Sequence, residues 1–281
     1  MKWLIAGFGD LGRSIAETLG DEALTTDAPV IALKRTQPEP GLPKTVVWQQ
    51  ADLSDPKSLE TLPTDITHVV YCAAPSARLE ALYQSTYLEG LKHLLDVLGR
   101  RAPKARFLFV SSTAVYGSAL SGEVNEDSPT TPTEFNGRIM LQTEQWLATH
   151  WPEHLILRLS GIYGPTRQML INKLKSGQVS VPASSDYWAN RIHVDDAARA
   201  AIHLLLRPDL TGVYIGTDST PLPLKELYSA IAQKIGAPTP KTGQPSPMMG
   251  KKRLSNLKLI ESGFIFRWPD ARDGYAAILS A

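Results

Sequence analysis

A glycine-rich motif near the N-terminus constrains the fold of this chain more than any other feature. Residues 3–6 are apolar, as in a buried strand, and Gly7-Phe8-Gly9-Asp10-Leu11-Gly12 follows them directly. Apolar residues then recur at helical spacing until Gly20. In such a strand–turn–helix unit, the first glycine permits the tight turn, the second lets a pyrophosphate approach the backbone, and the third lets helix and strand pack closely. The motif predicts a dinucleotide site that includes Gly7, Gly9, Asp10, Leu11 and Gly12.

The rest of the first half alternates short apolar runs with helical stretches. This alternation predicts a parallel sheet with helices on both faces, and it favours a dinucleotide site over a glycine turn without a ligand. We therefore predict an α/β fold, a doubly wound Rossmann sheet with a smaller C-terminal substrate lobe. The predicted strands are residues 3–6, 30–33, 46–48, 69–72, 107–110 and 155–157, and the longer predicted helices are 77–99 and 135–150.

The pattern becomes less regular after residue 159, where two segments are rich in Pro, Ser and Gly. The predicted elements of this part are loops at 176–190 and 237–251, helices at 194–206 and 224–235, and a strand at 213–215. The predicted domains are a dinucleotide-binding domain at 1–158, to which 194–216 returns, and a substrate-binding lobe made of 159–193 and 217–281.

The composition excludes several classes of protein and site. Lys and Arg number 29 against 28 Asp and Glu, a net charge of +1, so no overall charge attracts nucleic acid or an anionic membrane. The single cysteine, Cys72, rules out an internal disulfide and a cysteine-based zinc site, and it fits a reducing compartment. No apolar run approaches the roughly 20 residues of a membrane-spanning helix. We expect a cytoplasmic protein with a small-molecule substrate and without a nucleic acid or membrane partner.

The end of the second predicted strand bears on the identity of the dinucleotide. Sites for NAD usually place an acidic residue there to hold the ribose 2′-hydroxyl, whereas this chain has Lys34-Arg35-Thr36. Because a basic side chain pairs with a 2′-phosphate, Lys34 and Arg35 favour NADP over NAD, the alternative being a solvated basic strand end. Residues after the third strand are predicted to contact the adenine, and small residues after the fourth to lie beside the cofactor: Asp52 and Leu53, and Ala73 and Ala74.

Three later segments point, in order, to a known family. They are Val-Ser-Ser-Thr-Ala-Val-Tyr-Gly at 110–117, Arg-Leu-Ser-Gly-Ile-Tyr-Gly-Pro at 158–165 and Arg-Ile-His-Val-Asp-Asp at 191–196. With the glycine motif, they resemble the extended short-chain dehydrogenase/reductases, the NAD-dependent epimerase/dehydratase family, and most closely an atypical, YeeZ-like subgroup. The resemblance covers nearly the whole chain. It implies a Rossmann core, an NAD(P) site and a C-terminal lobe that closes over the substrate.

The chemistry of that family rests on a serine or threonine and on a Tyr-x-x-x-Lys pair. In the family, the lysine lowers the pKa of the tyrosine, which then exchanges a proton with a substrate hydroxyl. Ser112 matches the serine here, but Asn136 and Met140 occupy the tyrosine and lysine positions. Asparagine has no proton to exchange at neutral pH, and methionine supplies no charge. Taken singly, Asn136 is typical of a helix N-cap and Met140 of a core residue; together they indicate that the standard groups do not perform the reaction.

Two further departures agree with this interpretation. Tyr87 stands where the family usually has an asparagine, and Thr113-Ala114 stands where dehydratases of nucleotide sugars carry an Asp-Glu pair. The second departure removes the acid and base that would eliminate water, so sugar dehydration is not expected.

Other side chains are candidates for the missing catalytic roles. Tyr116 and Tyr163 lie in the family segments, and a neighbouring cation such as Arg138 or Arg191 would lower the pKa of a phenol. The alternative is that Tyr116 packs beside the cofactor and Tyr163 shapes the junction with the lobe.

Two other kinds of site are not expected. His193, Asp195 and Asp196 are more typical of a helix start than of a metal centre, because carboxylates stabilise the positive end of a helix. No Gly-x-Ser-x-Gly motif surrounds Ser112, which argues against a serine hydrolase.

Two functions stay open at this point. The first is an NADP-dependent oxidoreductase or epimerase-like enzyme acting on a small polar molecule, with a nucleotide sugar as one option. The second is a catalytically silent NADP-binding protein that senses cofactor state or regulates a partner. For the enzyme, the catalytic candidates are Ser112, Tyr116 and Tyr163, and the substrate-binding candidates are Ser112, Asn136 and Arg191. A homodimer through the helices at 79–99 and 135–150 is equally open.

Overall fold

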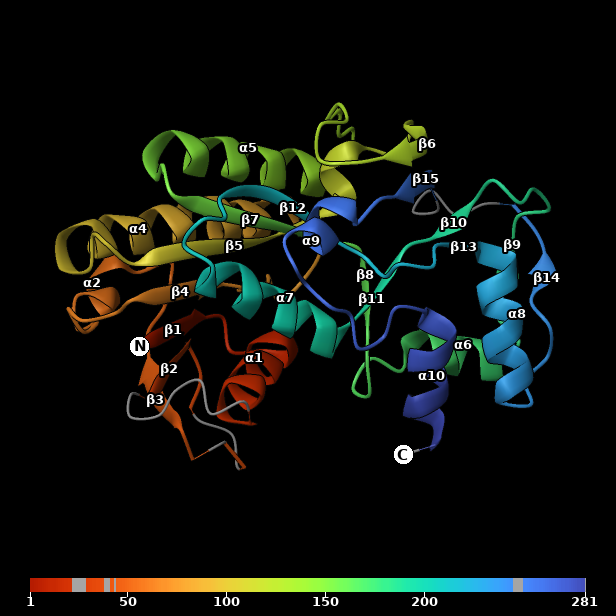
Figure 1. The fold of residues 1–281 in the computed structure, drawn as a ribbon, viewed down its shortest axis with the longest axis horizontal. Helices are drawn as coiled ribbons and strands as arrows, with labels where there is room; N and C mark the ends of the chain where they lie inside the picture. Colours follow the sequence, from red (N-terminus) through yellow and green to blue (C-terminus); the bar gives the residue numbers. More distant parts are fainter. Residues whose placement is uncertain (22–28, 38–40, 43, 245–249, 281) are drawn as a thin grey trace.

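Seven strands form one parallel sheet at the centre of the molecule (Figure 1). The computed structural model describes residues 1–21, 29–37, 41–42, 44–244 and 250–280. The strands are β1 (Trp3–Ala6), β2 (Val30–Lys34), β3 (Val46–Gln50), β4 (His68–Tyr71), β5 (Arg106–Ser112), β7 (His154–Leu159) and β12 (Gly212–Gly216). All neighbouring strands run parallel. The predicted α/β fold with a Rossmann sheet is therefore confirmed.

The order of the strands determines where a ligand can bind. The sheet runs β12-β7-β5-β4-β1-β2-β3, so the chain turns outward in both directions from β1. Ala6, the last residue of β1, lies beside Leu33 of β2 and Tyr71 of β4. In sheets of this kind, a crevice opens beyond the carboxyl ends of the strands at the point where the order reverses. That point lies between β1 and β4, directly above the glycine motif.

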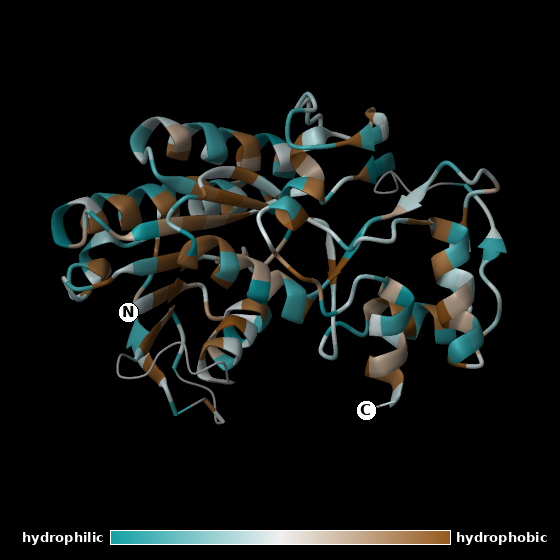
Figure 2. Cartoon of the chain, viewed as in Figure 1, coloured by the Kyte–Doolittle hydropathy of each residue, from teal (hydrophilic) through white to brown (hydrophobic). Residues whose placement is uncertain are grey.

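Helices cover both faces of the sheet (Figure 1). One face carries α1 (Asp10–Asp21) and α7 (Val194–Leu206), which pack on each other and on the strands. The other face carries α2 (Pro56–Leu59), α4 (Gly90–Arg101) and α5 (Phe135–His150). Hydrophobic residues follow the strands and the sides of the helices that face them (Figure 2). The sheet therefore separates two apolar cores, as a doubly wound fold requires.

The segment predicted as one helix over 77–99 is broken into three parts. These are α3 (Glu80–Tyr83), a π-helical turn (Gln84–Glu89) and α4. The hydroxyl of Tyr71 donates a hydrogen bond to the carbonyl of Thr86 inside the π-helical turn. A Cβ on Gly90 would lie 2.8 Å from the same hydroxyl. The prediction of a regular helix was wrong because a side chain from β4 enters the helical ladder, and such insertions widen a helix locally.

The C-terminal lobe is built from three helices and three short strand pairs (Figure 1). The helices are α6 (Met169–Lys175), α8 (Leu224–Lys234) and α10 (Ala271–Ser280). The strand pairs are β8 (Gly161–Tyr163) with β11 (Arg191–His193), β9 (Ser180–Val181) with β14 (Lys241–Thr242), and β10 (Trp188–Ala189) with β13 (Leu222–Pro223). The segments predicted as loops at 176–190 and 237–251 thus contain short strands, whose pairing partners are too distant in the chain to leave a local pattern.

One strand pair ties the C-terminal part of the chain to the sheet domain. β15 (Lys251–Leu254) pairs in parallel with β6 (Ser121–Val124), and α9 (Leu257–Glu261) then packs near β12. Leu259 and Phe264 belong to the same apolar core as α1 and α7. The domain boundaries of the sequence analysis stay a prediction, but residues 251–264 pack largely on the sheet domain.

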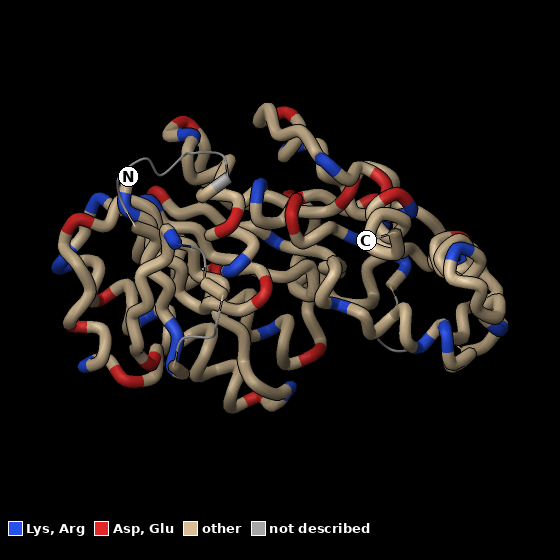
Figure 3. Tube along the Cα trace, turned by 90° about the horizontal axis from the view of Figure 1, so that it is seen from below, with Lys and Arg blue, Asp and Glu red and all other residues tan. Residues whose placement is uncertain are grey.

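Charge is evenly mixed along the molecule. Acidic and basic residues alternate along the trace of both the sheet domain and the lobe (Figure 3). Within the described ranges, no helix is both long and apolar enough to cross a membrane.

Candidate dinucleotide site and substrate cleft

A pocket of about 530 Å³ opens at the carboxyl ends of β1 to β4. The structure brings every residue predicted for cofactor binding into its wall. From the glycine motif and the strand ends these are Gly7, Gly9, Asp10, Leu11, Gly12, Lys34, Arg35, Asp52, Leu53, Ala73 and Ala74. Parallel strands deliver residues that are distant in sequence to one edge of the sheet, which is why a pattern of strand ends could predict the pocket.

The three glycines of the motif differ in what surrounds them. Gly7 has a φ of 101°, and a Cβ on it would lie 2.3 Å from the backbone of Ala73. A Cβ on Gly12 would lie 2.6 Å from the carbonyl oxygen of Gly7. A Cβ on Gly9 would meet nothing within 4 Å. Gly7 and Gly12 are thus needed by the protein itself, whereas Gly9 leaves open space beside the N-terminus of α1, where backbone N–H groups favour an anion.

The far end of the pocket combines two cations with one carboxylate. Lys34 and Arg35 lie at the end of β2, and Arg35 is exposed. Asp52 accepts hydrogen bonds from the backbone N–H and the hydroxyl of Ser54, at 2.9 and 2.7 Å. Partial burial opposes ionisation of Asp52, but the bonds from Ser54 and the charge of Arg35 outweigh it and lower its pKa. The carboxylate is thus held by its own loop.

Several residues of the pocket wall were not predicted. Leu82, Ser85 and Thr86 reach the pocket from α3 and the π-helical turn, and Arg167 reaches it from the segment after β8. The thiol of Cys72 also lines the pocket, bonded to the carbonyl of Gly7 at 3.2 Å, and burial raises its pKa to about 12. No local pattern marks these residues, because their place depends on how separate elements pack.

Helix α5 carries Asn136 and Met140, at the positions predicted to match the tyrosine and lysine of the family. Glu134 is the N-cap of α5 and Asn136 lies inside the first turn, so the interpretation of Asn136 as an N-cap was wrong. Its side-chain oxygen is buried without a hydrogen-bond partner among the described residues. Met140 is 3% exposed and belongs to the apolar core beneath the helix. Ser112 ends β5, where its hydroxyl accepts a bond from the N–H of Ala114 at 3.2 Å.

The model of the NAD dependent epimerase/dehydratase family matches residues 3–215 of this sequence. That range contains the glycine motif, the whole lining of the pocket and helix α5. The chain belongs to the NAD-dependent epimerase/dehydratase family. It is accordingly an epimerase-like protein that binds a nicotinamide dinucleotide.

Relatives agree with this assignment over different lengths. Protein YeeZ of Escherichia coli K12 is 31% identical over 189 residues, which span 66% of this chain and 66% of YeeZ. A Methylobacillus flagellatus structure, provisionally described as an NAD-dependent epimerase/dehydratase, is 34% identical, with a TM-score of 0.81 over 99% of this chain and 97% of its own. The fold also matches Thermus thermophilus UDP-glucose 4-epimerase in complex with NAD, which is 22% identical, with a TM-score of 0.83 over 100% and 98% of the two chains.

The two tyrosines considered as catalytic candidates lie outside the dinucleotide pocket. Tyr116 is fully buried, and its hydroxyl accepts a 2.8 Å bond from Arg158. Burial raises the pKa of Tyr116 to about 12 in spite of that cation. Tyr163 is 2% exposed and stacks on Tyr275, and burial, together with the charge of Asp218, raises its pKa. Both pKa values are raised rather than lowered, and among the described residues neither Arg138 nor Arg191 forms a hydrogen bond with either hydroxyl.

Arg191 lies at the junction between the two parts of the molecule. A Cβ on Gly161 would lie 2.5 Å from its guanidinium, so the absence of a side chain on Gly161 makes room for Arg191. The guanidinium donates to the hydroxyl of Tyr228 at 2.8 Å and to the carbonyl of Asn190 at 3.0 Å. Asp218, whose backbone N–H bonds to the carbonyl of Arg191, is 1% exposed, and burial with a nearby carboxylate raises its pKa to about 8.

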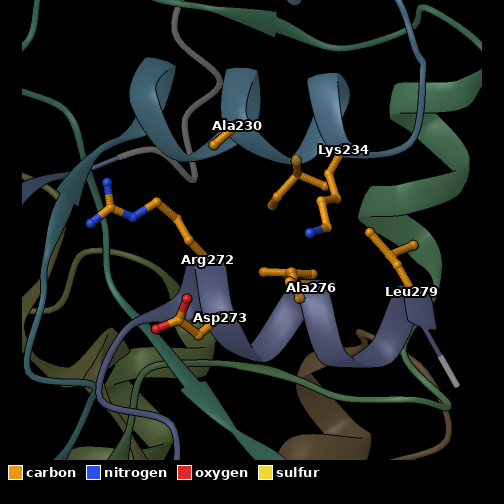
Figure 4. A pocket seen from close by; sticks show the side chains of 8 residues that line it. Ala230, Lys234, Arg272, Asp273, Ala276 and Leu279 are labelled. Atoms are coloured by element: carbon orange, nitrogen blue, oxygen red, sulfur yellow. The ribbon is translucent and has the colours of Figure 1, made fainter.

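A second, smaller hollow of about 220 Å³ lies in the lobe between α8 and α10 (Figure 4). Lys234 and Leu279 face each other across it, while Arg272 at its edge is paired with Asp270 and Glu226. His193 accepts a bond from the N–H of Asp195 and caps α7. No group of three His, Cys, Asp or Glu suited to a metal occurs in the described part of the chain.

Proposed function

We propose that this protein is an NADP-dependent oxidoreductase that acts on a small polar substrate without the Tyr/Lys pair of its family. The observation that carries the proposal is the wall of the dinucleotide pocket. Gly9 leaves space for a pyrophosphate at one end, and Lys34 and Arg35 stand at the other, where an NAD site usually has a carboxylate. The residues of the chain would bind and orient the substrate, and a nicotinamide dinucleotide held in the pocket would exchange a hydride with it.

The preference for NADP follows from the charges at the end of β2. The carboxylate of Asp52 accepts two bonds from Ser54 through Oδ1, and no hydrogen bond joins it to Arg35 among the described residues. Arg35 is exposed and free to turn toward a 2′-phosphate, with which a guanidinium forms strong charge-assisted hydrogen bonds. In NAD, which lacks the 2′-phosphate, the ribose offers no anion for Lys34 and Arg35 to bind.

Charge reversal at Arg35 tests the cofactor. Arg35→Asp should weaken NADPH binding at least about tenfold more than NADH binding, because only NADPH carries the 2′-phosphate, and tenfold corresponds to about 1.4 kcal/mol. Isothermal titration of both ligands gives the two dissociation constants. Lys104→Asp is the matched control, since Lys104 is exposed and lies outside the pocket. Equal weakening of NADPH and NADH would contradict the assignment of NADP.

Ser112 and Asn136 are the groups proposed to hold the reacting end of the substrate. The buried oxygen of Asn136 lacks a partner, and leaving such an acceptor unbonded costs about 1–3 kcal/mol, so a substrate hydroxyl that donates to it is favoured. An amide cannot deliver a proton, and the two buried tyrosines are poorly suited to do so, so a water molecule exchanges the proton. The fold shared with a UDP-glucose 4-epimerase supports including nucleotide sugars among the substrates.

Turnover is tested by screening small hydroxy and carbonyl compounds, nucleotide sugars included, while following the absorbance of NADPH. Ser112→Ala and Asn136→Ala should each lower kcat/KM at least tenfold and leave the dissociation constant of NADPH within twofold. Tight NADPH binding with no turnover of any compound would contradict the proposal that this protein is an enzyme.

A catalytically silent NADP-binding protein is the second candidate, and the position of Met140 favours it. The side chain at the lysine position is buried in the apolar core, so α5 presents no cation to a nicotinamide ribose. The double variant Asn136→Tyr/Met140→Lys restores the family pair. If activity on a nucleotide sugar appears only in this variant, the scaffold is intact and the native chain is silent; native activity that the double variant does not increase supports the enzyme.

A further inference from the structure

One cation of the dinucleotide pocket, Arg167, does not come from the end of a strand of the central sheet. The Nε of Arg167 donates a 2.7 Å hydrogen bond to one carboxylate oxygen of Asp10, and the hydroxyl of Thr166 donates a 2.6 Å bond to the other. Asp10 belongs to the glycine motif, and Arg167 lies in the pocket wall. Two adjacent residues, more than 150 positions along the chain, therefore hold both oxygens of the acidic residue next to Gly9.

The segment that carries Arg167 is the start of the lobe. It leaves β8 at Gly164 and enters α6, and the N–H of Arg167 bonds back to the carbonyl of Gly164 at 3.0 Å. Gly164 itself packs on Val194 at the start of α7, where a Cβ would lie 2.6 Å from the valine side chain. The turn is thus anchored at its base, and it extends one arginine over the N-terminus of α1.

The charges around Gly9 require a cation in this position. The carboxylate of Asp10 lies in the first turn of α1, beside the open space above Gly9, and alone it would repel a pyrophosphate. Arg167 cancels that charge. Within the described residues only its Nε has a side-chain partner, so the two terminal nitrogens of the guanidinium are available to an anion in the pocket. A guanidinium can hold a carboxylate with one edge and a phosphate with another.

We propose that Arg167 binds the pyrophosphate of the dinucleotide directly, and that the lobe thereby takes part in cofactor binding. The proposal rests on the proposed function in one respect, that the pocket takes a dinucleotide. Bound pyrophosphate bridges the N-terminus of α1 and the segment 164–168. The bound cofactor would then fix the base of the lobe.

A surface ion pair without a role in binding is the alternative. The side chains of Arg167 and Asp10 are 39% and 29% exposed, and pairs of that kind contribute little to stability. Such a pair would join the lobe to α1 whether or not a ligand is present. The two interpretations differ in which ligands bind more weakly when Arg167 is replaced.

Two ligands separate the ends of the pocket, NADPH and adenosine 2′-monophosphate, which keeps the 2′-phosphate but lacks the pyrophosphate. In isothermal titrations, Arg167→Gln should weaken NADPH at least tenfold and change the binding of adenosine 2′-monophosphate less than twofold. Arg35→Gln should weaken both ligands. Arg207→Gln is the matched control, because Arg207 also pairs with a single exposed aspartate, Asp209, and it lies outside the pocket. It should change neither.

A further variant separates direct binding from neutralisation of Asp10. If Arg167 acts only by cancelling the charge of Asp10, the double variant Asp10→Asn/Arg167→Gln regains the affinity of the native protein for NADPH, and direct binding is overturned. If Arg167 contacts the pyrophosphate, the double variant stays at least fivefold weaker than Asp10→Asn. NADPH affinity within twofold of native in Arg167→Gln also overturns the proposal. Failure of the native protein to bind either NADPH or NADH would instead refute the proposed function.

Discussion

The dinucleotide pocket and the interior outside it differ in how their polar groups are partnered. In the pocket, the carboxylates of Asp10 and Asp52 each accept two hydrogen bonds. Outside the pocket, the side-chain oxygens of Asn136, Ser160 and Tyr163 are buried without a partner among the described residues, as is that of Thr45. Buried polar atoms without partners are costly, so each of these oxygens is a candidate to bond a ligand or a water molecule.

The pocket and helix α5 differ in how closely they follow the family pattern. The pocket keeps all three glycines and the strand-end residues in place. Helix α5 has an internal polar support, whereas Asn136 and Met140 stand at the positions that the sequence analysis aligns with the reactive pair. One turn beyond Met140, Glu144 accepts bonds from Ser111 at 2.5 Å and from Arg158 at 2.7 Å. The polar support of α5 is therefore independent of Asn136 and Met140.

The largest effect is expected from removing that support. In the Glu144–Arg158 pair, the side chains are only 4% and 6% exposed, so Glu144→Ala leaves an unpaired buried charge and should lower the free energy of unfolding by about 3–5 kcal/mol. Urea unfolding followed by circular dichroism measures the change. Glu261→Ala, at an exposed position, should stay within about 0.5 kcal/mol of the native protein. A small effect of Glu144→Ala would mean that α5 is held by apolar packing alone.

A substitution at Gly9 should separate cofactor binding from stability. Because a Cβ there meets open space, Gly9→Val should fold normally yet fill the room left for the pyrophosphate. We expect at least about a hundredfold loss of NADPH affinity, about 2.7 kcal/mol, with an unchanged melting temperature. Gly7→Ala should instead lower the melting temperature, since its Cβ would clash with the backbone of Ala73 in the protein itself. Retained NADPH binding in Gly9→Val would place the pyrophosphate elsewhere.

The sequence predicted the dinucleotide pocket better than it predicted the contacts between distant segments. The pocket was predictable because each of its parts is a short local pattern at a strand end, and parallel strands bring those ends together. Arg167 was not, since its partner Asp10 lies 157 positions away in the chain and no motif links the two. Likewise, the pairing of β6 with β15 joins segments about 130 residues apart.

The tyrosines show a different limit of sequence reasoning. Tyr116 and Tyr163 stand in segments that identify the family, but their pKa depends on burial, which no spacing reveals. Tyr163 is enclosed because Gly274 of α10 has no side chain; a Cβ there would lie 2.0 Å from the phenol oxygen. Tyr116 is enclosed by the same network that supports α5, through Arg158. Each role depends on a residue more than 40 positions away.

Asp218 provides a test whose effect is spread over several pH units. Its pKa is raised to about 8 in the folded protein from an ordinary value of 3.8, so between pH 4 and pH 8 the unfolded chain loses a proton that the folded protein keeps. The contribution of Asp218 to stability should therefore fall as pH rises through this window, by at most about 1.4 kcal/mol per pH unit, and level off above pH 8. Asp218→Asn cannot titrate and should remove this slope, so that its advantage over the native protein grows from pH 4 to pH 8. Urea unfolding at several pH values measures both slopes. Parallel slopes would show that Asp218 is already ionised in the folded protein at pH 4.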